Sequence, residues 1–228
     1  MKNIIIFDCG PSISEVSDMY GSSPEWIQNI LSDVGCKFLW VKSYAGDKVG
    51  NDMGDAWIIT GSPRSVYEEK DWMLNLESKI RYSEENHIPV LGICFGHQLI
   101  AKSLGGIVDL NPNGWELGSY PIELTAEGLK SSILYGIQNN DIVYQSHQDC
   151  VVTLPQRAKK LAFNSKGIQA FSINDYIYGV QFHPEFSYDI IRKYVQVRMN
   201  KGIKVDNPLV TESNAGVNVL LNFIKKIL

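Results

Sequence analysis

The sequence lacks the long apolar segments and paired cysteines that mark several large classes of protein. No apolar run approaches the roughly 18 residues that a membrane-spanning helix needs. The N-terminal segment MKNIIIFDCG has one lysine and a four-residue apolar run, which predicts a first strand rather than a signal peptide. The four cysteines show no C-x-x-C spacing, which argues against a zinc site and a disulfide framework. We therefore expect a cytoplasmic protein.

Basic residues are too few for a nucleic-acid surface. The chain has 21 lysines and arginines against 25 acidic residues, a formal net charge of -4 and a pI of about 5.6. Because no basic excess is available to meet a phosphate backbone, we expect no nucleic-acid partner. Hydrophobic residues make up 44% of the 228 residues, enough for a substantial core. We expect residues 1–228 to form a single domain.

Strand and helix patterns alternate over the first hundred residues. Short apolar runs predict strands at residues 2–7, 36–41, 56–60 and 90–93. Helical spacing predicts helices at residues 22–35, at 71–86, and from 95 or 96 onward. In the first helix, Ser23 suits the cap and Pro24 the first helical position. This alternation favours a parallel sheet with covering helices.

The second half of the chain is richer in short strands. Strands are predicted at residues 106–110, 115–124, 141–147, 159–165, 168–173 and 176–182. They suit antiparallel hairpins added to the parallel sheet, which gives an α/β fold with a mostly parallel central sheet and extra antiparallel strands. Two helices are predicted near 189–199 and 213–227, with a polar surface loop at 200–213 between them.

The stretch VLGICFGHQ places one cysteine, Cys94, where a predicted strand turns into a predicted helix. Gly92 and Gly96 flank it, as expected for a sharp turn that exposes a nucleophile. The carboxyl ends of strands are where open α/β sheets bind ligands, and the helix amides favour the reactive thiolate. The alternative is a buried structural cysteine, the role we predict for Cys9, Cys36 and Cys150.

Two further stretches supply the partners that a cysteine nucleophile needs. GVQFHPEFS places His183 as a candidate base and Glu185 as the group that orients it. IITGSPRSVYEE follows a predicted strand with a turn whose Ser62 amide, together with the Phe95 amide, suits an oxyanion hole. Each stretch alone is ordinary loop sequence. Together, each following a predicted strand, they favour a catalytic site.

These residues resemble the motifs of the class I (triad) glutamine amidotransferase family. GICFGHQ is similar to its nucleophile motif, GVQFHPE to its His-Glu motif and TGSPRSVYE to its oxyanion turn. QSHQD resembles the glutamine-binding loop, as in the amidotransferase domain of GMP synthase, and the resemblance extends over residues 1–190. It implies a flavodoxin-like three-layer core and hydrolysis of glutamine to glutamate and ammonia, without metal or cofactor. Ser62 stands where the family often has glycine.

The resemblance also implies a role for each matching residue. Cys94 is the nucleophile, His183 the base and Glu185 its orienting group, while Ser62 and Phe95 supply the oxyanion hole. Substrate-binding residues are Gly61, Gln98, Ser146, His147 and Gln148. The region around Glu116 is also expected to offer groups to the substrate, whereas His97 and Asp149 are expected to be structural.

Three functions remain open for such a site. The chain is a glutaminase subunit that passes ammonia to a separate synthetase, a free-standing γ-glutamyl peptidase or transferase, or a non-catalytic binding module. Nothing in the sequence resembles the ATP pyrophosphatase domain of GMP synthase, so the acceptor of ammonia is not indicated. The complete Cys94, His183 and Glu185 set argues against the binding module. We expect a small-molecule substrate, either glutamine or another γ-glutamyl compound, and no membrane partner.

Overall fold

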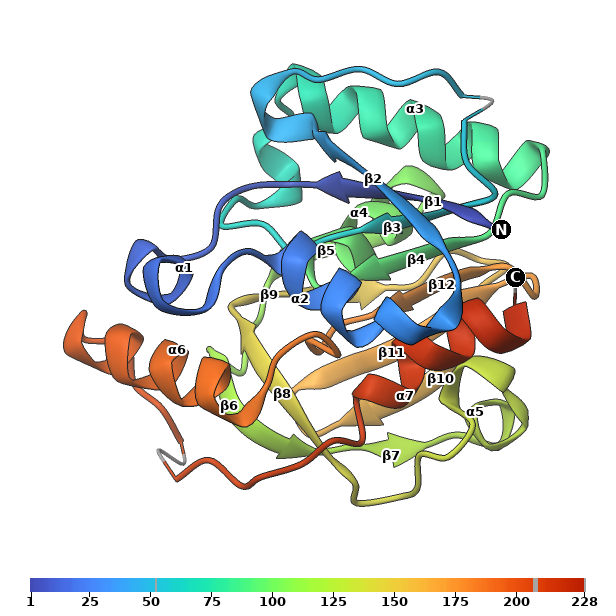
Figure 1. Ribbon diagram of the computed structural model, residues 1–228. Coiled ribbons are helices and arrows are strands. Elements are labelled where there is room, and N and C mark those ends of the chain that lie inside the picture. The colour runs from blue at the N-terminus through green and yellow to red at the C-terminus, as the bar shows by residue number, and fades with distance from the viewer. Residues whose placement is uncertain (52, 207–208, 228) are drawn as a thin grey trace.

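The computed structural model describes residues 1–51, 53–206 and 209–227, and its centre is an eight-stranded sheet (Figure 1). In sheet order the strands are β2 (Lys37–Lys42), β1 (Asn3–Asp8), β3 (Ala56–Ile59), β4 (Val90–Ile93), β12 (Ile177–Val180), β11 (Gly167–Ile173), β10 (Lys159–Asn164) and β7 (Glu123–Leu124). Neighbours are parallel from β2 to β12 and antiparallel from β12 to β7.

Two antiparallel pairs stand apart from this sheet. They are β5 (Ile107–Leu110) with β9 (Asp149–Thr153), and β6 (Glu116–Pro121) with β8 (Ile142–His147). The predicted fold class, α/β with a mostly parallel central sheet and added antiparallel strands, is therefore confirmed.

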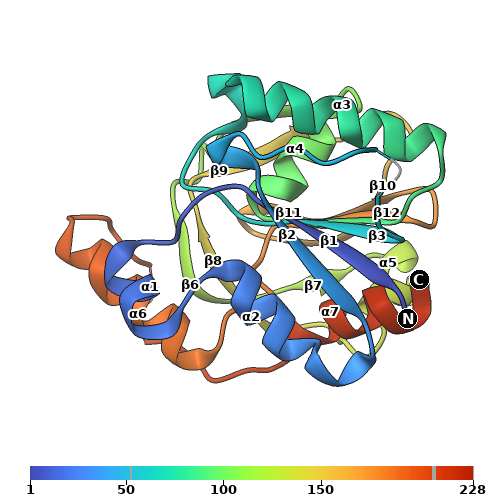
Figure 2. The same cartoon turned by 45° about the horizontal axis from the view of Figure 1, so that its top comes forward.

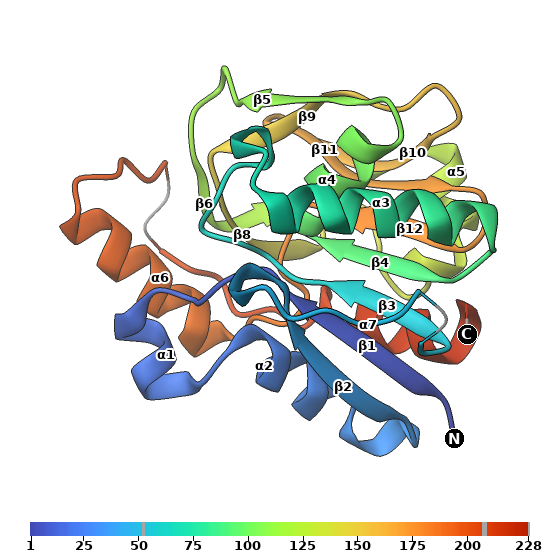
Figure 3. The same cartoon turned by 90° about the horizontal axis from the view of Figure 1, so that it is seen from above.

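Helices cover both faces of the central sheet. The α-helices are α1 (Ser14–Tyr20), α2 (Ser23–Ile30), α3 (Asp71–Glu85), α4 (Phe95–Ser103), α5 (Ala126–Lys130), α6 (Tyr188–Asn200) and α7 (Val217–Asn222), and a π-helical turn, η5 (Phe223–Ile227), follows α7. Helices α3 and α4 lie on one face, and α2 and α7 lie on the other (Figures 1, 2 and 3). The fold is thus three layers, helix–sheet–helix.

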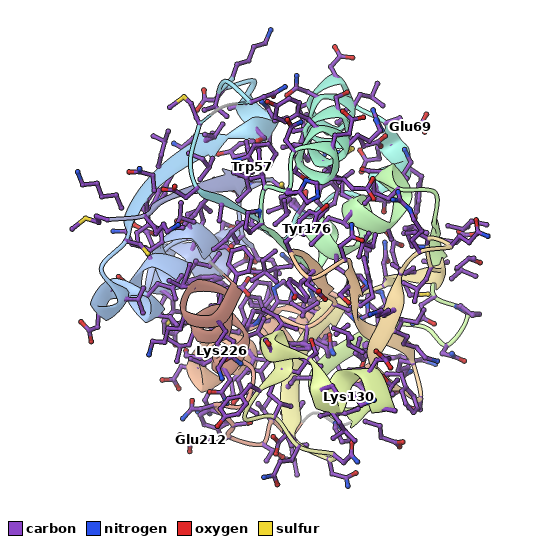
Figure 4. All side chains as sticks on the ribbon, turned by 90° about the vertical axis from the view of Figure 1, so that its right-hand side faces the viewer. Trp57, Glu69, Lys130, Tyr176, Glu212 and Lys226 are labelled. Atoms are coloured by element: carbon purple, nitrogen blue, oxygen red, sulfur yellow. The ribbon has the colours of Figure 1, made fainter. Side chains whose placement is uncertain are left out.

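The core divides along the two faces because side chains alternate along each strand. In β1, Ile4 and Ile6 pack in the cluster that contains Ile27 of α2. Ile5 and Phe7 face the opposite side, in the cluster with Trp57 of β3. Trp57 is buried in this core, whereas Glu69, Lys130 and Glu212 are exposed (all labelled in Figure 4). Burial of both sheet faces explains the nearly continuous apolar runs of the parallel strands.

Several boundaries differ from the sequence prediction. The first predicted helix is capped by Ser22 rather than Ser23, because the Ser22 amide and hydroxyl both donate to the Glu25 carboxylate, at 2.6 and 2.8 Å. The predicted strand 115–124 is divided into β6 and β7. The final predicted helix begins at Val217, and of the predicted loop 200–213, residues 207 and 208 lie outside the described residues.

Among the α-helices and strands of the described residues, α1, β9 and α5 had no counterpart in the prediction. Helix α1 is seven residues long and buries only Val16, so its apolar periodicity is too weak to detect.

Within the described residues, no helix is both long enough and apolar enough to cross a membrane.

The parallel register brings four strand ends to one edge of the sheet. Phe7 of β1 pairs with Ile59 of β3, Ile59 pairs with Gly92 of β4, and Ile93 of β4 pairs with Val180 of β12. The segments that follow these strands therefore emerge side by side. Helices α1 and α6 lie together beyond this edge (Figure 1).

Candidate active site

Cys94 occupies a strained turn between β4 and α4. Its φ of 51° and ψ of -99° lie in a region that residues with a side chain rarely adopt. The turn is fixed from both sides, since the Cys94 amide donates to the Val180 carbonyl at 2.9 Å and its carbonyl accepts from the Gln98 amide at 3.1 Å. The thiol thus lies at the carboxyl end of β4 and the first turn of α4.

The two flanking glycines allow α4 to approach the sheet at backbone distance. A Cβ added to Gly92 would lie 2.5 Å from the carbonyl carbon and oxygen of Gly96. A Cβ added to Gly96 would lie 2.4 Å from the carbonyl oxygen of Ile59 on β3. Any side chain at either position would push the helix, and Cys94 with it, away from the strands.

His183 and Glu185 follow β12 and form a buried pair. The His183 Nδ1 lies 2.9 Å from Glu185 Oε1, and the Ser23 hydroxyl donates to the same oxygen at 3.2 Å. The Phe186 ring stacks on the imidazole with centroids 4.0 Å apart and planes 9° from parallel. A carboxylate on one edge and an aromatic ring on one face hold the imidazole in a single orientation.

The electrostatics of His183 are set by opposing effects. Burial lowers its pKa, but the negative charges of Glu185 and Cys94, with hydrogen bonds to both side chains, raise the pKa to about 10. The imidazolium is therefore favoured while both partners are charged. His183 thus lies within reach of Cys94 and holds a proton that a reaction at the sulfur can use.

Ser62 and Phe95 both lie beside Cys94. The Ser62 hydroxyl donates to the Cys9 carbonyl at 2.7 Å. The turn therefore accommodates a serine side chain at the position where the resembled family often has glycine. Phe95 is the first residue of α4, and the first amides of a helix have no acceptor within the helix. The arrangement is compatible with the proposed pair of oxyanion donors.

Two cavities meet at Cys94. The larger, about 290 Å³, is lined on one side by Phe95, Gln98 and Trp115. The smaller, about 50 Å³, is lined by Gly61, His183, Glu185, Trp26 and Tyr194, among others. The lining residues common to both are Ile13, Ser62, Pro63, Cys94, Ser146 and Arg198. Cys94 therefore borders both the cavity that His183 lines and the roomier cavity that Gln98 lines.

The predicted substrate-binding residues divide between these cavities. Gln98, His147 and Gln148 line the larger cavity, Gly61 the smaller, and Ser146 both. The Gln98 Nε2 donates to the Asp149 carbonyl at 2.9 Å and to Gln181 Oε1 at 3.1 Å, which leaves Gln98 Oε1 as the atom available to a ligand.

The His147 side chain belongs to the protein interior. Its Nε2 lies 3.0 Å from Glu116 Oε2 and its Nδ1 lies 3.0 Å from the Asp149 carbonyl. The Glu116 side chain itself is fully buried in this pair and offers nothing to a ligand, whereas its neighbour Trp115 lines the larger cavity, so a contribution of this region to substrate binding stays a prediction. Any contact of His147 with a ligand is left to its backbone.

Asp149 joins the two loops that carry predicted site residues. Its carboxylate accepts from the Ser65 hydroxyl at 2.5 Å and from the Tyr67 hydroxyl at 3.1 Å. These bonds tie the turn after β3 to the loop after β8. His97, by contrast, is fully buried against the Phe171 ring, 4.8 Å between centroids, and burial lowers its pKa to about 3.

Arg198 of α6 and Trp26 of α2 line the site but were not predicted. Arg198 had a signal in the sequence. It falls four residues after Tyr194 and eight after Ile190, on the apolar face of the predicted helix. Burying a charged side chain on such a face costs free energy unless the charge has a partner, so its presence there indicates a specific role. Trp26 looked like an ordinary core residue, and only the packing of α2 against this edge reveals its place.

A metal centre has no support in this region. Within residues 1–51, 53–206 and 209–227, no cluster of three or more His, Cys, Asp or Glu side chains is arranged to hold a metal ion.

Comparisons with known proteins point to one family. The family model described as "Glutamine amidotransferase class-I" matches residues 15–196. Gamma-glutamyl peptidase 4 of Arabidopsis thaliana is 31% identical over 196 residues, covering 83% of this chain and 78% of the peptidase. GMP synthase (glutamine-hydrolyzing) of Borrelia garinii subsp. bavariensis is 31% identical over 229 residues, covering 100% of this chain but only 35% of the synthase.

The fold has a match among solved structures. The crystal structure of glutamine amido transferase from Methylobacillus flagellatus superposes with a TM-score of 0.80 and covers 100% of this chain and 96% of that chain. Sequence identity is 20%, so this likeness bears on the fold alone.

The glycine contacts predict a selective loss of stability. Replacing Gly96 with Ala should lower the free energy of unfolding by about 1–3 kcal/mol, because the new Cβ overlaps the Ile59 carbonyl. Gly216→Ala is the matched control, since Gly216 has helical φ and ψ and its added Cβ would come no closer than 3.4 Å to Pro184. Urea denaturation of both variants tests this, and equal losses would contradict the close-approach explanation.

The position of Cys94 predicts selective alkylation. With limiting iodoacetamide, Cys94 should react first, because burial raises the pKa of Cys9, Cys36 and Cys150 whereas Cys94 lies at a helix N-terminus beside His183. Peptide mapping by mass spectrometry gives the extent at each cysteine, with urea-unfolded protein as the control for intrinsic reactivity. Equal labelling of the four cysteines in the folded protein would remove the case for a special thiol.

Proposed function

Because the chain belongs to the class I glutamine amidotransferase family, we propose that it hydrolyses the side-chain amide of glutamine through a γ-glutamyl thioester on Cys94. The observation that carries this proposal is the meeting of a strained strand–helix cysteine with the buried His183–Glu185 pair. A structural cysteine has no need of a backbone conformation that costs energy, nor of a charged imidazole beside it.

In the proposed reaction, the Cys94 thiolate attacks the amide carbon of the substrate side chain. The tetrahedral oxyanion accepts hydrogen bonds from the Ser62 and Phe95 amides, which stabilise the charge that develops. His183 donates its proton to the departing nitrogen, ammonia leaves, and a thioester remains on Cys94. His183 then takes a proton from water as the water attacks the thioester, and glutamate is released. Glu185 holds the imidazole throughout.

The unequal cavities support glutamine as the substrate. The leaving nitrogen must lie on the His183 side of the sulfur, where it receives its proton. The cavity that His183 lines, about 50 Å³, has room for a leaving group the size of ammonia. The larger cavity, about 290 Å³, then holds the rest of the substrate, with Gln98 Oε1 positioned to accept from its α-amino group. Ammonia released here would serve a separate synthetase.

A γ-glutamyl peptidase is the second candidate. The chain covers more than three quarters of gamma-glutamyl peptidase 4 but about a third of the GMP synthase, so a protein of this size is known to carry the peptidase name. The larger leaving group of a γ-glutamyl peptide must pass the small cavity beside His183.

A single domain over residues 1–228 and a cytoplasmic location stay predictions.

The His183–Glu185 pair predicts a graded loss of activity. His183→Asn should lower the rate of glutamate release by about 10²–10⁴-fold, since it removes the proton donor and acceptor. Glu185→Gln should cost less, because an amide oxygen can still accept from Nδ1 although the charge is lost. Steady-state glutamate release measures both, and circular dichroism checks that the variants fold. A near wild-type rate for His183→Asn would make the triad assignment wrong.

The leaving-group argument predicts the substrate preference of the isolated chain. Glutamine should be hydrolysed weakly by the chain alone and faster once its synthetase is added, whereas γ-glutamyl dipeptides should be poor substrates. The measurement is glutamate release from glutamine, γ-glutamyl dipeptides and glutathione at equal concentrations, with Cys94→Ala as the blank. Turnover of a γ-glutamyl peptide about ten times faster than glutamine, without a partner, would replace the amidotransferase proposal with the peptidase.

A further inference from the structure

Arg198 is a partly buried charged side chain of α6 that lines both cavities. Its Nε donates to the Ser146 hydroxyl at 3.1 Å, and its guanidinium carbon lies 4.5 Å from the centroid of the Trp115 ring. Among residues 1–51, 53–206 and 209–227, no carboxylate forms an ion pair with it. Arg192, on the outer side of the same helix, shows the ordinary arrangement, with Asp189 at 3.9 Å.

The surroundings of Arg198 are more costly for a charge than those of a surface arginine. Burial lowers its pKa, and the opposing influences of Tyr194 and Cys94 are smaller. A partly desolvated guanidinium is expected to have an anionic partner. Apart from Cys94, which is the reacting group itself in the proposed function, the described residues supply no such partner, so the partner is expected to be a ligand.

The location of Arg198 limits what that ligand is. It lines both cavities, as do Cys94 and Ser146, so a group bound to it lies close to the reacting sulfur. The other basic side chains that line the larger cavity are already paired, Arg64 with Glu68 at 3.4 Å and Lys201 with Glu15 at 3.1 Å.

The acidic side chains of the cavities likewise have donors within the protein, although Glu185 Oε2 is buried without a hydrogen-bond partner. Asp149 accepts from Ser65 and Tyr67, and Glu185 is held by His183 and Ser23. Among the described lining residues, Arg198 therefore carries the charge that remains unmatched.

We infer that Arg198 binds a carboxylate of the substrate. The inference rests on the proposed function, in which the substrate is a γ-glutamyl compound whose α-carboxylate carbon lies four bonds from the reacting carbonyl carbon. With Nε held by Ser146 and one face covered by Trp115, the two terminal amino groups are left in a fixed orientation. A fixed guanidinium matches a carboxylate with two parallel hydrogen bonds and loses little side-chain entropy on binding.

The α-carboxylate is favoured over a carboxylate on the leaving group. Ser146 belongs to the loop predicted to hold glutamine, and Trp115 lines the larger cavity, where the glutamyl part of the substrate lies in the proposed reaction. Arg198 would then reject γ-glutamyl amides whose α-carboxylate is masked.

Matched substrates test the inference through the variants Arg198→Met and Arg198→Lys. Arg198→Met should raise KM for L-glutamine by about 10- to 100-fold, the range for losing a hydrogen bond to a charged group, with kcat changed much less. The same variant should not change KM for L-glutamine α-amide, which lacks the carboxylate. Arg198→Lys should restore part of the affinity, and Arg192→Met, which removes a charge from the outer face of α6, should leave both substrates unaffected.

A second pair of substrates identifies which carboxylate is bound. γ-Glutamylglycine and γ-glutamylmethylamide share the α-carboxylate but differ in the carboxylate of the leaving group. An effect of Arg198→Met confined to γ-glutamylglycine would assign Arg198 to the leaving group, and an equal effect on both supports the α-carboxylate. Equal KM increases for substrates with and without any free carboxylate would overturn the inference.

An alkylation ratio tests Arg198 without any turnover. The rate constants for Cys94 with iodoacetate, which carries a carboxylate, and with the neutral iodoacetamide are measured for wild type and Arg198→Met. The ratio of iodoacetate to iodoacetamide should fall several-fold in the variant, and an unchanged ratio would contradict a carboxylate site. A wild-type chain that hydrolyses no γ-glutamyl amide would refute the proposed function, while this ratio still decides the role of Arg198.

Discussion

The structure depends on how closely the first turn of α4 approaches the strands beneath it. Gly92 and Gly96 leave no space for a Cβ between helix and sheet, and the chain can turn from β4 into α4 only through the strained backbone of Cys94. This one contact fixes Cys94, the proposed nucleophile, together with the Phe95 amide beside it and Gln98 one turn further on. The energetic cost of the turn is offset by the packing of α4 residues such as Phe95 and Leu99 in the core on that face of the sheet.

The remaining parts of the site reach Cys94 through the register of the parallel strands. Pairing of Ile93 with Val180 places the segment after β12 next to the turn after β4, which brings His183 to the sulfur although 89 positions separate them in sequence. The opposite layer contributes as well, since Ser23 at the start of α2 binds Glu185. The proposed machinery is thus assembled from the sheet edge and from both helical layers, so rigidity of the whole fold supports its geometry.

Local sequence was sufficient for the parts of this site that depend on backbone turns. The G-x-C-x-G and His-Pro-Glu segments each specify a strand end with a particular chemistry, so Cys94, His183, Glu185, Ser62 and Phe95 were predicted together and lie together. Residues that enter the site from the faces of helices could not be predicted from local sequence. Trp26 and Arg198 depend on how α2 and α6 pack at long range, and the burial of Glu116 depends on β6 pairing with β8. The choice between Ser22 and Ser23 depended on which serine Glu25 could reach, which the sequence pattern alone leaves open.

The charges around Cys94 show why a single side chain without a partner of opposite charge is informative. Along the cavity walls, carboxylates are matched by hydroxyls or by His183, and two basic side chains are matched by glutamates. A protein gains nothing from leaving a partly buried guanidinium unmatched, because desolvation costs free energy that an internal carboxylate would recover. An internal partner at Arg198 would, however, occupy the position of an anionic substrate and compete with it. An unmatched Arg198 is therefore the arrangement expected if the missing charge arrives with the molecule that Cys94 attacks.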